Sequence, residues 1–271
     1  MKVVFEVLDY ASKRAQNTQY IQTDATLLQD LLGAPDEHDQ ATLNLAHTQF
    51  QGAIDTTGQR QPPDRGVLIF CSDDHLTYPE DGFRGVYFDN GDNRQAQVRA
   101  KPPVPGATGP CKGNLRAFVY PFGFKDGSQP GGNAVVLCSN WDGGAITSTK
   151  DVKGEIGDWR KGGDLRRYSQ GIETVGQYLS YMIIHELIHV ANLQQCPAAL
   201  PDGNIGEVYG YEKIAGHAPG ATGGSPPSAN NRQHNADSFA FLASAWYLNL
   251  YKWTNGAAVL TKKTERPPNE L

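Results

Sequence analysis

The chain has 271 residues, with 24 lysines and arginines, 29 aspartates and glutamates, and a net charge of −5. This length suits one large domain or two small ones. The acidic balance argues against the basic surface that nucleic-acid binding requires. The longest apolar run, around 182–184, is interrupted by charged residues and is too short for a membrane span, so we expect no membrane partner either.

The predicted elements, in chain order, fall into three parts. Residues 1–60 lack β-like runs, and helix-like apolar spacing occurs at 23–32 and 38–56. Residues 61–145 are β-rich, and helical periodicity returns within 170–252. Helices around a small, mainly antiparallel sheet predict an α+β fold in a single domain, 1–271. The expected strands are 67–70, 86–88, 115–120 and 134–137, and the later helical segments are 172–193 and 237–252.

The motif that carries most chemistry is His185-Glu186-Leu187-Ile188-His189, an H-E-x-x-H sequence in an almost continuously apolar stretch. Residues four apart lie on the same face of a helix, so both imidazoles can reach one metal ion. The carboxylate of Glu186 is then placed to take a proton from a water molecule at the metal. Burying these polar groups is unfavourable unless each has a partner, which favours a catalytic zinc site over a solvated helix.

A catalytic zinc site normally has three protein ligands, so a third must come from elsewhere in the chain. The metzincin pattern is excluded, because its later glycine and histidine are replaced by Asn192 and Gln195. The chain also has no methionine after Met182 that could form a Met-turn. The remaining candidates are the downstream acids Asp202, Glu207, Glu212 and Asp237.

Three motifs together resemble the aspzincins, the deuterolysin and peptidyl-Lys metalloendopeptidase family of fungal secreted enzymes. They are H-E-L-I-H, an acid shortly before Val208-Tyr209-Gly210-Tyr211, and Asn235-Ala236-Asp237-Ser238-Phe239. The resemblance covers roughly residues 60–252 and is strongest over 178–250. It implies a zincin-like fold and a monomeric, secreted zinc metalloendopeptidase. Such an enzyme binds one Zn²⁺ per chain and hydrolyses peptide bonds in proteins or peptides.

The third ligand is where the chain departs from the family. The family has its ligand aspartate three residues before the tyrosine, and this chain has Gly206 there. We favour Glu207, which is fixed beside the Tyr-Gly pair, and place Asp202 second. Asp237, Glu212 or no third protein ligand remain as further alternatives.

Two more residues receive roles from the same resemblance. Tyr209, with Tyr211 second, is expected to donate a hydrogen bond to the oxyanion of the substrate. Packing of a loop onto the core is an equally good reading of either tyrosine alone. Asp237 is expected to accept the free ring N–H of a zinc-bound histidine. Alternatively, Asn235 or Asp237 caps the following helix.

The cysteines bear on localisation. Cys71, Cys111, Cys138 and Cys196 are even in number and show no C-x-x-C spacing for a structural zinc. Two disulfides would suit an extracellular enzyme, whereas free buried thiols are the simpler alternative. The family resemblance implies secretion and at least one disulfide. The segment Met1–Asp9 carries acids and does not match a signal peptide, so either this is a mature or engineered chain or the protein is not classically secreted.

Two other functions compete with the peptidase. The changed third-ligand motif is compatible with a catalytically inactive, secreted zinc-binding protein. A gluzincin-type peptidase with Glu207 as ligand is the second rival, although gluzincins normally supply this glutamate from a helix. The segment 202–211 is rich in glycine and follows two prolines, so a loop is expected there.

Overall fold

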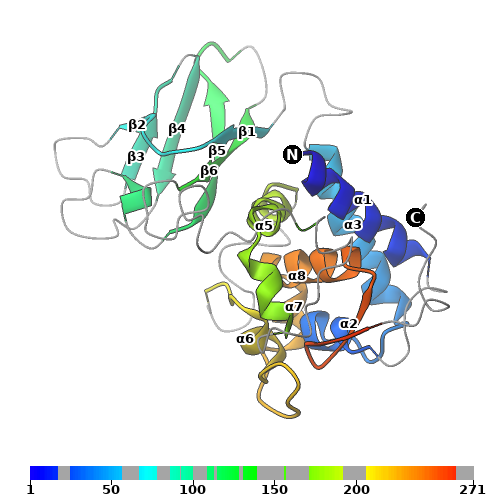
Figure 1. The fold of residues 1–271 in the computed structure, drawn as a ribbon. Coiled ribbons are helices and arrows are strands. Elements are labelled where there is room, and N and C mark those ends of the chain that lie inside the picture. The colour runs from blue at the N-terminus through cyan, green and yellow to red at the C-terminus, as the bar shows by residue number, and fades with distance from the viewer. Residues whose placement is uncertain are drawn as a thin grey trace. The chain divides into compact units, whose positions relative to one another are not determined.

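The computed structural model describes residues 1–17, 25–56, 67–77, 86–91, 93–99, 109–112, 115–127, 131–138, 156, 171–191 and 206–260. The chain divides into two compact units (Figure 1). Unit 1 comprises Met1–Ile54 and Lys153–Leu271, and unit 2 comprises Asp55–Val152. The mixture of helices with a mainly antiparallel sheet agrees with the α+β expectation. The zincin-like fold and the single domain stay predictions.

Unit 1 is built from helices and one small hairpin. The expected helix 38–56 is confirmed, although it begins two residues later, at 40. Of the expected helix 23–32, residues 27–32 are helical. The elements are α1 (Lys2–Gln16), α2 (Leu27–Leu32), α3 (Gln40–Thr56), the 3₁₀ helix η5 (Gly171–Gln177), α5 (Leu179–Ala191), α6 (Tyr211–Ala215), α7 (Ala229–Gln233), α8 (Ala236–Tyr247), β7 (Tyr251–Thr254) and β8 (Ala257–Leu260).

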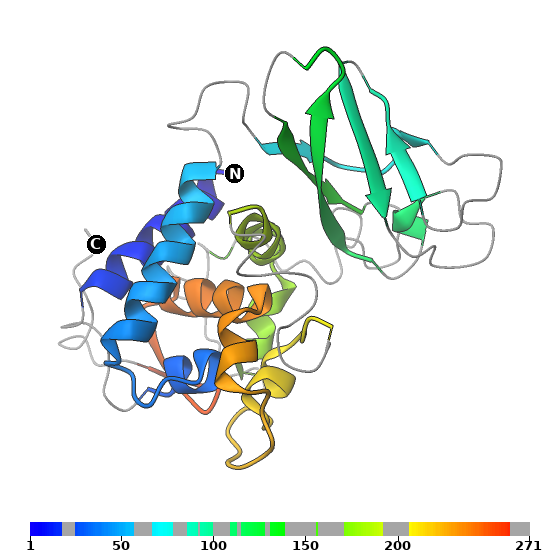
Figure 2. The same ribbon diagram turned by 180° about the vertical axis from the view of Figure 1, so that it is seen from behind.

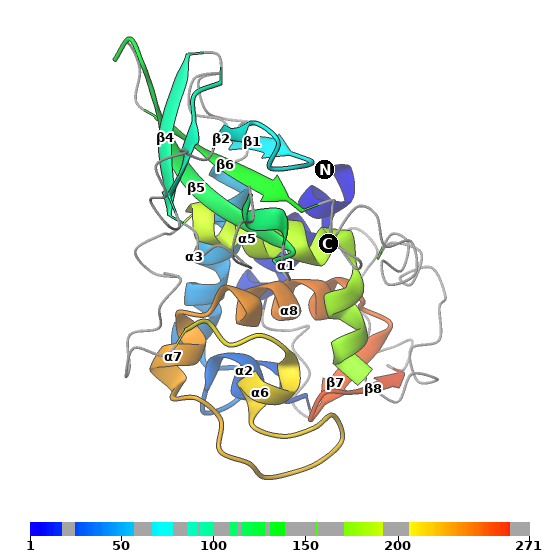
Figure 3. The ribbon, with the colours of Figure 1, turned by 90° about the vertical axis from the view of Figure 1, so that its left-hand side faces the viewer.

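Helix α8 lies at the centre of unit 1, between α5 and α2 (Figures 1 and 3). Every residue from Ala236 to Tyr247 is buried, as expected for a helix that is apolar on all sides. It packs against α1 and α5, and its Phe239 and Trp246 rings meet Phe50 of α3 edge to face. The motif helix α5 therefore lies against the most buried element of the unit.

The Gly- and Pro-rich segment 216–228 forms a largely exposed loop between α6 and α7 (Figure 2). This agrees with the sequence, in which glycine and proline leave no apolar face to bury. Among the helices of the described residues, none combines the length and the apolarity that crossing a membrane requires.

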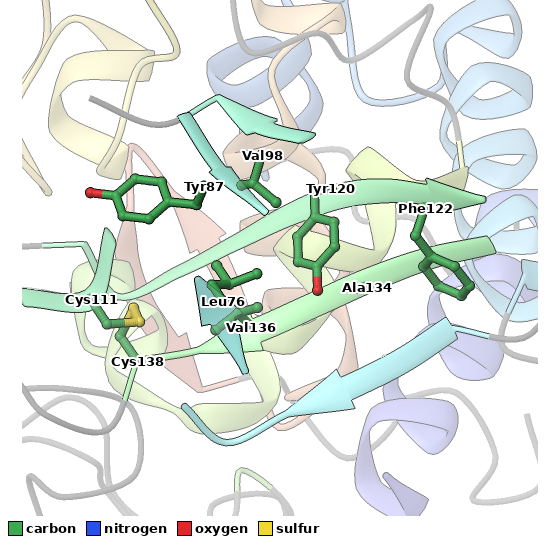
Figure 4. Packing of buried hydrophobic residues seen from close by; sticks show 9 residues of the cluster. All are labelled: Leu76, Tyr87, Val98, Cys111, Tyr120, Phe122, Ala134, Val136 and Cys138. Carbon is green, nitrogen blue, oxygen red and sulfur yellow. A yellow bond between two sulfur atoms is a disulfide. The ribbon is translucent and has the colours of Figure 1, made fainter. Parts of the chain in front are cut away.

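Unit 2 contains a curled six-stranded sheet with the strand order β1-β6-β5-β4-β3-β2. The β1–β6 pair is parallel and the other pairs are antiparallel. Side chains from several strands form its buried cluster, which Figure 4 shows beside the Cys111–Cys138 disulfide. The strands are β1 (Val67–Phe70), β2 (Leu76–Thr77), β3 (Val86–Asp89), β4 (Arg94–Arg99), β5 (Ala117–Phe124) and β6 (Gly132–Leu137).

The disulfide accords with the expectation of at least one such bond. It joins Cys111, in the 3₁₀ turn η3 (Pro110–Lys112), to Cys138 at the end of β6. Cys71 is an exposed free thiol, and Cys196 lies outside the described residues.

Two expected helices are shorter than the sequence indicated. The expected helix 237–252 ends at Tyr247, and the chain then enters the β7–β8 hairpin. In β7 the burial of side chains alternates, as expected for a strand: Tyr251 and Trp253 are buried, and the residues that follow each of them are half-buried. The segment 172–193 begins as the 3₁₀ turn η5, and the α-helix proper spans 179–191. Helix α1 lies in 1–60, which the sequence indicated as a helical N-terminal part without giving this helix bounds, while strands β2, β4, β7 and β8 had not been expected.

Candidate metal centre

Helix α5 places the two motif histidines side by side. His185 and His189 are one helical turn apart, and their ring centroids are 4.9 Å apart. Both residues are buried, as are their neighbours from Ser180 to Val190. The apolar remainder of α5 packs into unit 1, so the ring nitrogens are held in a site that excludes most water.

Glu207 meets both histidines from a different part of the chain. The segment 206–209 is neither helical nor part of a sheet strand, and it immediately precedes α6. Glu207 Oε2 lies 3.5 Å from His185 Nε2 and 3.2 Å from His189 Nε2. The structure thus brings the favoured third-ligand candidate to the histidine pair.

These three side chains fit a metal ion. Their ligand atoms all lie within 4.8 Å of one another. Ligands of a tetrahedral zinc, at about 2.1 Å from the metal, are about 3.4 Å apart, close to the two observed N–O distances. Glu207 Oε1 is buried and has no hydrogen-bond partner among the residues that the structure describes, which leaves this carboxylate with unused acceptor capacity. Two imidazoles and a carboxylate form a donor set typical of zinc.

The electrostatics of the cluster favour positive charge at this point. Burial alone would raise the pKa of Glu207, but the two imidazoles outweigh burial and hold it well below its usual range. Burial alone would lower the pKa of His185 and His189, but Glu207 and other nearby carboxylates raise both. A cation between these nitrogens and the carboxylate would be stabilised by the same interactions.

Asp237 supports His185 from the opposite side. Its Oδ1 lies 3.1 Å from Nδ1 of His185, so the imidazole is held at one nitrogen while Nε2 faces Glu207. Asp237 also accepts the hydroxyl of Tyr181 and, at 2.8 Å, the backbone N–H of Gly210. This is the contact that a supporting carboxylate requires, since it fixes the tautomer and orientation of a metal-ligating histidine.

Asn235 binds the segment that carries Glu207. Its Oδ1 accepts the N–H of Val208 at 3.2 Å, and its Nδ2 donates to the carbonyl of Val208 at 2.9 Å. Its side chain makes no capping hydrogen bond to α8, although it occupies the N-cap position. The first turn of α8 therefore contacts the loop as well as His185 (Figure 3, where the segment before α6 is yellow).

The two candidate tyrosines differ sharply in their surroundings. Tyr209 is 58% exposed, and its ring stacks on His185 with the centroids 5.7 Å apart. Desolvation of its hydroxyl and the neighbouring Glu207 raise its pKa, so the phenol stays protonated and able to donate. Tyr211 is fully buried, and its hydroxyl donates to Asp30 Oδ2 at 2.6 Å. Of these two tyrosines, Tyr209 is the one that lies against the histidine pair.

Glu186 follows His185 in the sequence and is buried. Burial raises the pKa of its carboxyl group and outweighs the two imidazoles, which lower it. A carboxylate with a raised pKa is a stronger base than an exposed one, which suits proton transfer near neutral pH.

The remaining ligand candidates have other positions. Asp237 contacts the far nitrogen of His185, and Glu212 lies in the first turn of α6, outside the cluster of three. Asp202 lies outside the described residues. Two contributors were not expected from the sequence. They are Tyr181, which binds Asp237, and Glu173, whose Oε1 accepts the N–H of Glu212 at 2.8 Å at the start of α6. No local pattern marks either one, because their partners are distant in sequence.

Comparisons of the chain with models of protein families, with curated proteins and with solved structures found no match.

Proposed function

We propose that this chain is a zinc-dependent metalloendopeptidase that hydrolyses peptide bonds in proteins. The observation that carries the proposal is the convergence of His185, His189 and Glu207 on one point, with the buried Glu186 on the same helix as the two histidines. Each residue type has a distinct task in such a site. Two imidazoles and a carboxylate bind the ion, and a second carboxylate that does not bind it moves the proton.

In the proposed reaction, each residue of the site has a separate role. His185, His189 and Glu207 would hold the zinc ion, which when bound would supply an acidified water and polarisation of the scissile carbonyl. Glu186 takes the proton of the attacking water and passes it to the leaving amine. The hydroxyl of Tyr209 donates a hydrogen bond to the carbonyl oxygen as negative charge develops there. Asp237 keeps His185 oriented throughout, through its contact with Nδ1.

The resemblance to the aspzincins supports the same assignment, together with a zincin-like fold. Gly206 occupies the family's ligand position, and a Cβ atom at Gly206 would meet nothing within 4 Å. Glu207, one residue later, supplies a carboxylate with a longer side chain that reaches both histidines. We therefore propose Glu207 as the third ligand and one zinc ion per chain.

We further propose a secreted, monomeric enzyme that acts on protein or peptide substrates, with neither nucleic acid nor membrane as a partner. The disulfide Cys111–Cys138 supports an oxidising compartment, where such bonds persist. The net charge of −5 supports the absence of a nucleic-acid partner.

A gluzincin-type site is less well supported. Glu207 lies in the non-helical segment before α6, whereas gluzincins present this glutamate from a helix. An inactive zinc-binding protein shares the same ligands, so activity must separate it from the peptidase.

The test combines elemental analysis for zinc with casein cleavage, on the wild-type chain and on Glu186→Gln. We expect one zinc per chain in both proteins and chelator-sensitive cleavage in the wild type alone. Glutamine keeps the shape of Glu186 but cannot accept the proton, so turnover should fall by at least about 10²-fold. Zinc without cleavage in the wild type would favour the inactive binding protein. Undiminished cleavage by Glu186→Gln would refute the role of Glu186.

A further inference from the structure

We propose that Asn235 is a positioning residue that holds Glu207 within reach of His185 and His189. This inference rests on the proposed function, because it assigns a role at the same metal site. Asn235 is 1% exposed and stands immediately before α8, where an asparagine would ordinarily cap its own helix. Its side chain caps no backbone N–H of α8, although its Nδ2 donates to Ser238 Oγ at 3.1 Å. The same side chain also reaches a residue 27 positions earlier in the chain.

The geometry of that contact fixes one residue at both of its backbone groups. Asn235 Oδ1 accepts the N–H of Val208, and Nδ2 donates to the C=O of the same residue. Residues paired across antiparallel strands exchange two hydrogen bonds in the same way. The Asn235 side chain thus makes the two hydrogen bonds that a residue of a neighbouring strand would make to Val208. Because Val208 directly follows Glu207, these bonds also restrict the position of Glu207.

The loop needs such an anchor because its own sequence does not fix it. Gly206 precedes Glu207, and Gly210, with φ of +90°, follows Tyr209. Glycine gives the backbone wide freedom at both ends of this short segment. Three hydrogen bonds join the backbone of this segment to Asn235 and to the first turn of α8. Two are made by Val208 with the Asn235 side chain, and the third runs from the N–H of Gly210 to Asp237.

Asparagine is suited to this task by its chemistry. Its amide carries an acceptor and donors on one short, planar group. Aspartate would retain the acceptor for the N–H of Val208 but place an oxygen against the carbonyl of Val208. Alanine would leave both backbone groups without this partner. Glutamine is one methylene longer and would displace the loop.

The anchor acts on one ligand and not on the others. Asp237, two residues further on, contacts His185 through a separate hydrogen bond, and both histidines are carried by α5. Replacing Asn235 also removes its hydrogen bond to Ser238 Oγ in the first turn of α8. The positioning role predicts that the effect on metal binding acts through Glu207. That restriction separates a positioning role from a general loss of stability.

The experiment measures zinc affinity of the full chain by competition with a chromophoric chelator. It compares the wild type, Asn235→Ala, Glu207→Ala and the double variant. We expect Asn235→Ala to weaken binding by roughly 10- to 100-fold, the range typical of supporting residues around metal ligands. In the Glu207→Ala background, Asn235→Ala should cause no further loss. Ser12→Ala is the matched control, since Ser12 is a buried residue and its replacement removes partly buried hydrogen bonds to His47 and Gln51 between α1 and α3.

The outcomes separate this inference from the proposed function. If the wild type binds no zinc, the proposed function fails. If the wild type binds zinc but Asn235→Ala binds it equally well, only the positioning role fails. An equal loss with and without Glu207, or an equal loss in Ser12→Ala, also overturns it.

A second variant covers the case in which Asn235→Ala does not fold. Asn235→Asp keeps the size of the side chain and its acceptor, and its added negative charge would by itself strengthen cation binding. We expect it to bind zinc more weakly than the wild type, because the donor to Val208 is lost. Unchanged or tighter binding would contradict the proposal.

Discussion

At the scale of single residues, Asp237 connects the parts of the metal centre. One carboxylate oxygen accepts from His185 and Tyr181, and the other accepts from the backbone of Gly210. Buried charged groups are tolerated when their acceptor capacity is used in this way. Asp237 thus orients a ligand on α5 and anchors the loop that carries Glu207.

The choice of third ligand can be tested by comparing Glu207→Ala with Asp202→Ala. We expect Glu207→Ala to lose zinc, because a site with two histidines alone lacks the third protein ligand. Asp202→Ala serves as the control from the same acid-containing segment and should retain zinc. The measurement is zinc content after dialysis against a weak chelator. Retention by Glu207→Ala together with loss by Asp202→Ala would reverse the assignment.

The two tyrosines can be separated by Tyr209→Phe and Tyr211→Phe. Tyr209→Phe removes the hydroxyl expected beside the substrate carbonyl, and kcat should fall by roughly 10²- to 10³-fold with zinc retained. Tyr211→Phe removes the hydrogen bond to Asp30 and the contact of the same hydroxyl with His217 Nε2 at 3.3 Å, both away from the histidine pair of α5. It should lower stability by about 1 kcal/mol and leave kcat nearly unchanged. Steady-state kinetics on a fluorogenic peptide would show the difference, and a larger kcat loss in Tyr211→Phe would exchange the two roles.

At the scale of elements, the short helix α2 shows that a residue outside a helix can accept hydrogen bonds from its first N–H groups. The N-cap of α2, Thr26, makes no side-chain capping bond. Glu37 supplies it, because its Oε1 accepts the N–H groups of Leu28 at 2.7 Å and Gln29 at 3.2 Å. A carboxylate at a helix N-terminus is favourable, but Glu37 is almost fully buried, and burial raises its pKa to about 7.

This raised pKa gives a pH dependence of known sign. Between about pH 4.5 and 7 the folded state retains a proton on Glu37 that the unfolded state has lost, so stability falls as pH rises. Glu37→Gln keeps an acceptor and does not ionise. Its free energy of unfolding, relative to wild type, should rise by up to about 3 kcal/mol across this range, at about 1.4 kcal/mol per pKa unit. Urea unfolding at several pH values measures the difference, and a pH-independent difference would refute it.

The β7–β8 hairpin shows what a local pattern can reveal. Asn255 and Gly256 form its two-residue turn, with φ of 48° and 71°. An Asn-Gly pair between alternating residues is a strong hairpin signal, because both positions need positive φ. The apolar spacing that continued α8 to residue 252 concealed this signal, although the turn itself is present in the sequence.

At the scale of the whole molecule, the candidate metal centre and the six-stranded sheet belong to different compact units. The residues around the cluster, from Glu173 to Asp237, belong to unit 1, while β1 to β6 belong to unit 2. Unit 2 contains the disulfide, and both of its cysteines, Cys111 and Cys138, belong to the buried cluster of the sheet. The residues that stabilise the sheet are therefore different from those that form the candidate metal centre.

We expect removal of the disulfide to act on unit 2 without abolishing zinc binding. Closing a 27-residue separation stabilises a fold by about 3.5 kcal/mol through the entropy of the unfolded chain. The double variant Cys111→Ser, Cys138→Ser should show faster hydrogen exchange in β5 and β6, measured by mass spectrometry. Zinc content should stay at the wild-type level. Unchanged exchange in these strands would show that the bond contributes little.

The sequence by itself determined the parts of this protein that depend on local periodicity. The spacing of His185 and His189 on a buried helix, and Glu186 between them, follows from 3.6 residues per turn and needs no knowledge of the rest of the fold. Several strands of the sheet were likewise visible as short apolar runs.

Only the tertiary structure decided which distant groups complete the site. Glu207 meets His189 across 18 residues, Asp237 meets His185 across 52, and Asn235 meets Val208 across 27. These contacts depend on how α8 packs against α5 and where the intervening loop closes. No local pattern encodes that closure, because it results from burial of the whole apolar surface of α8.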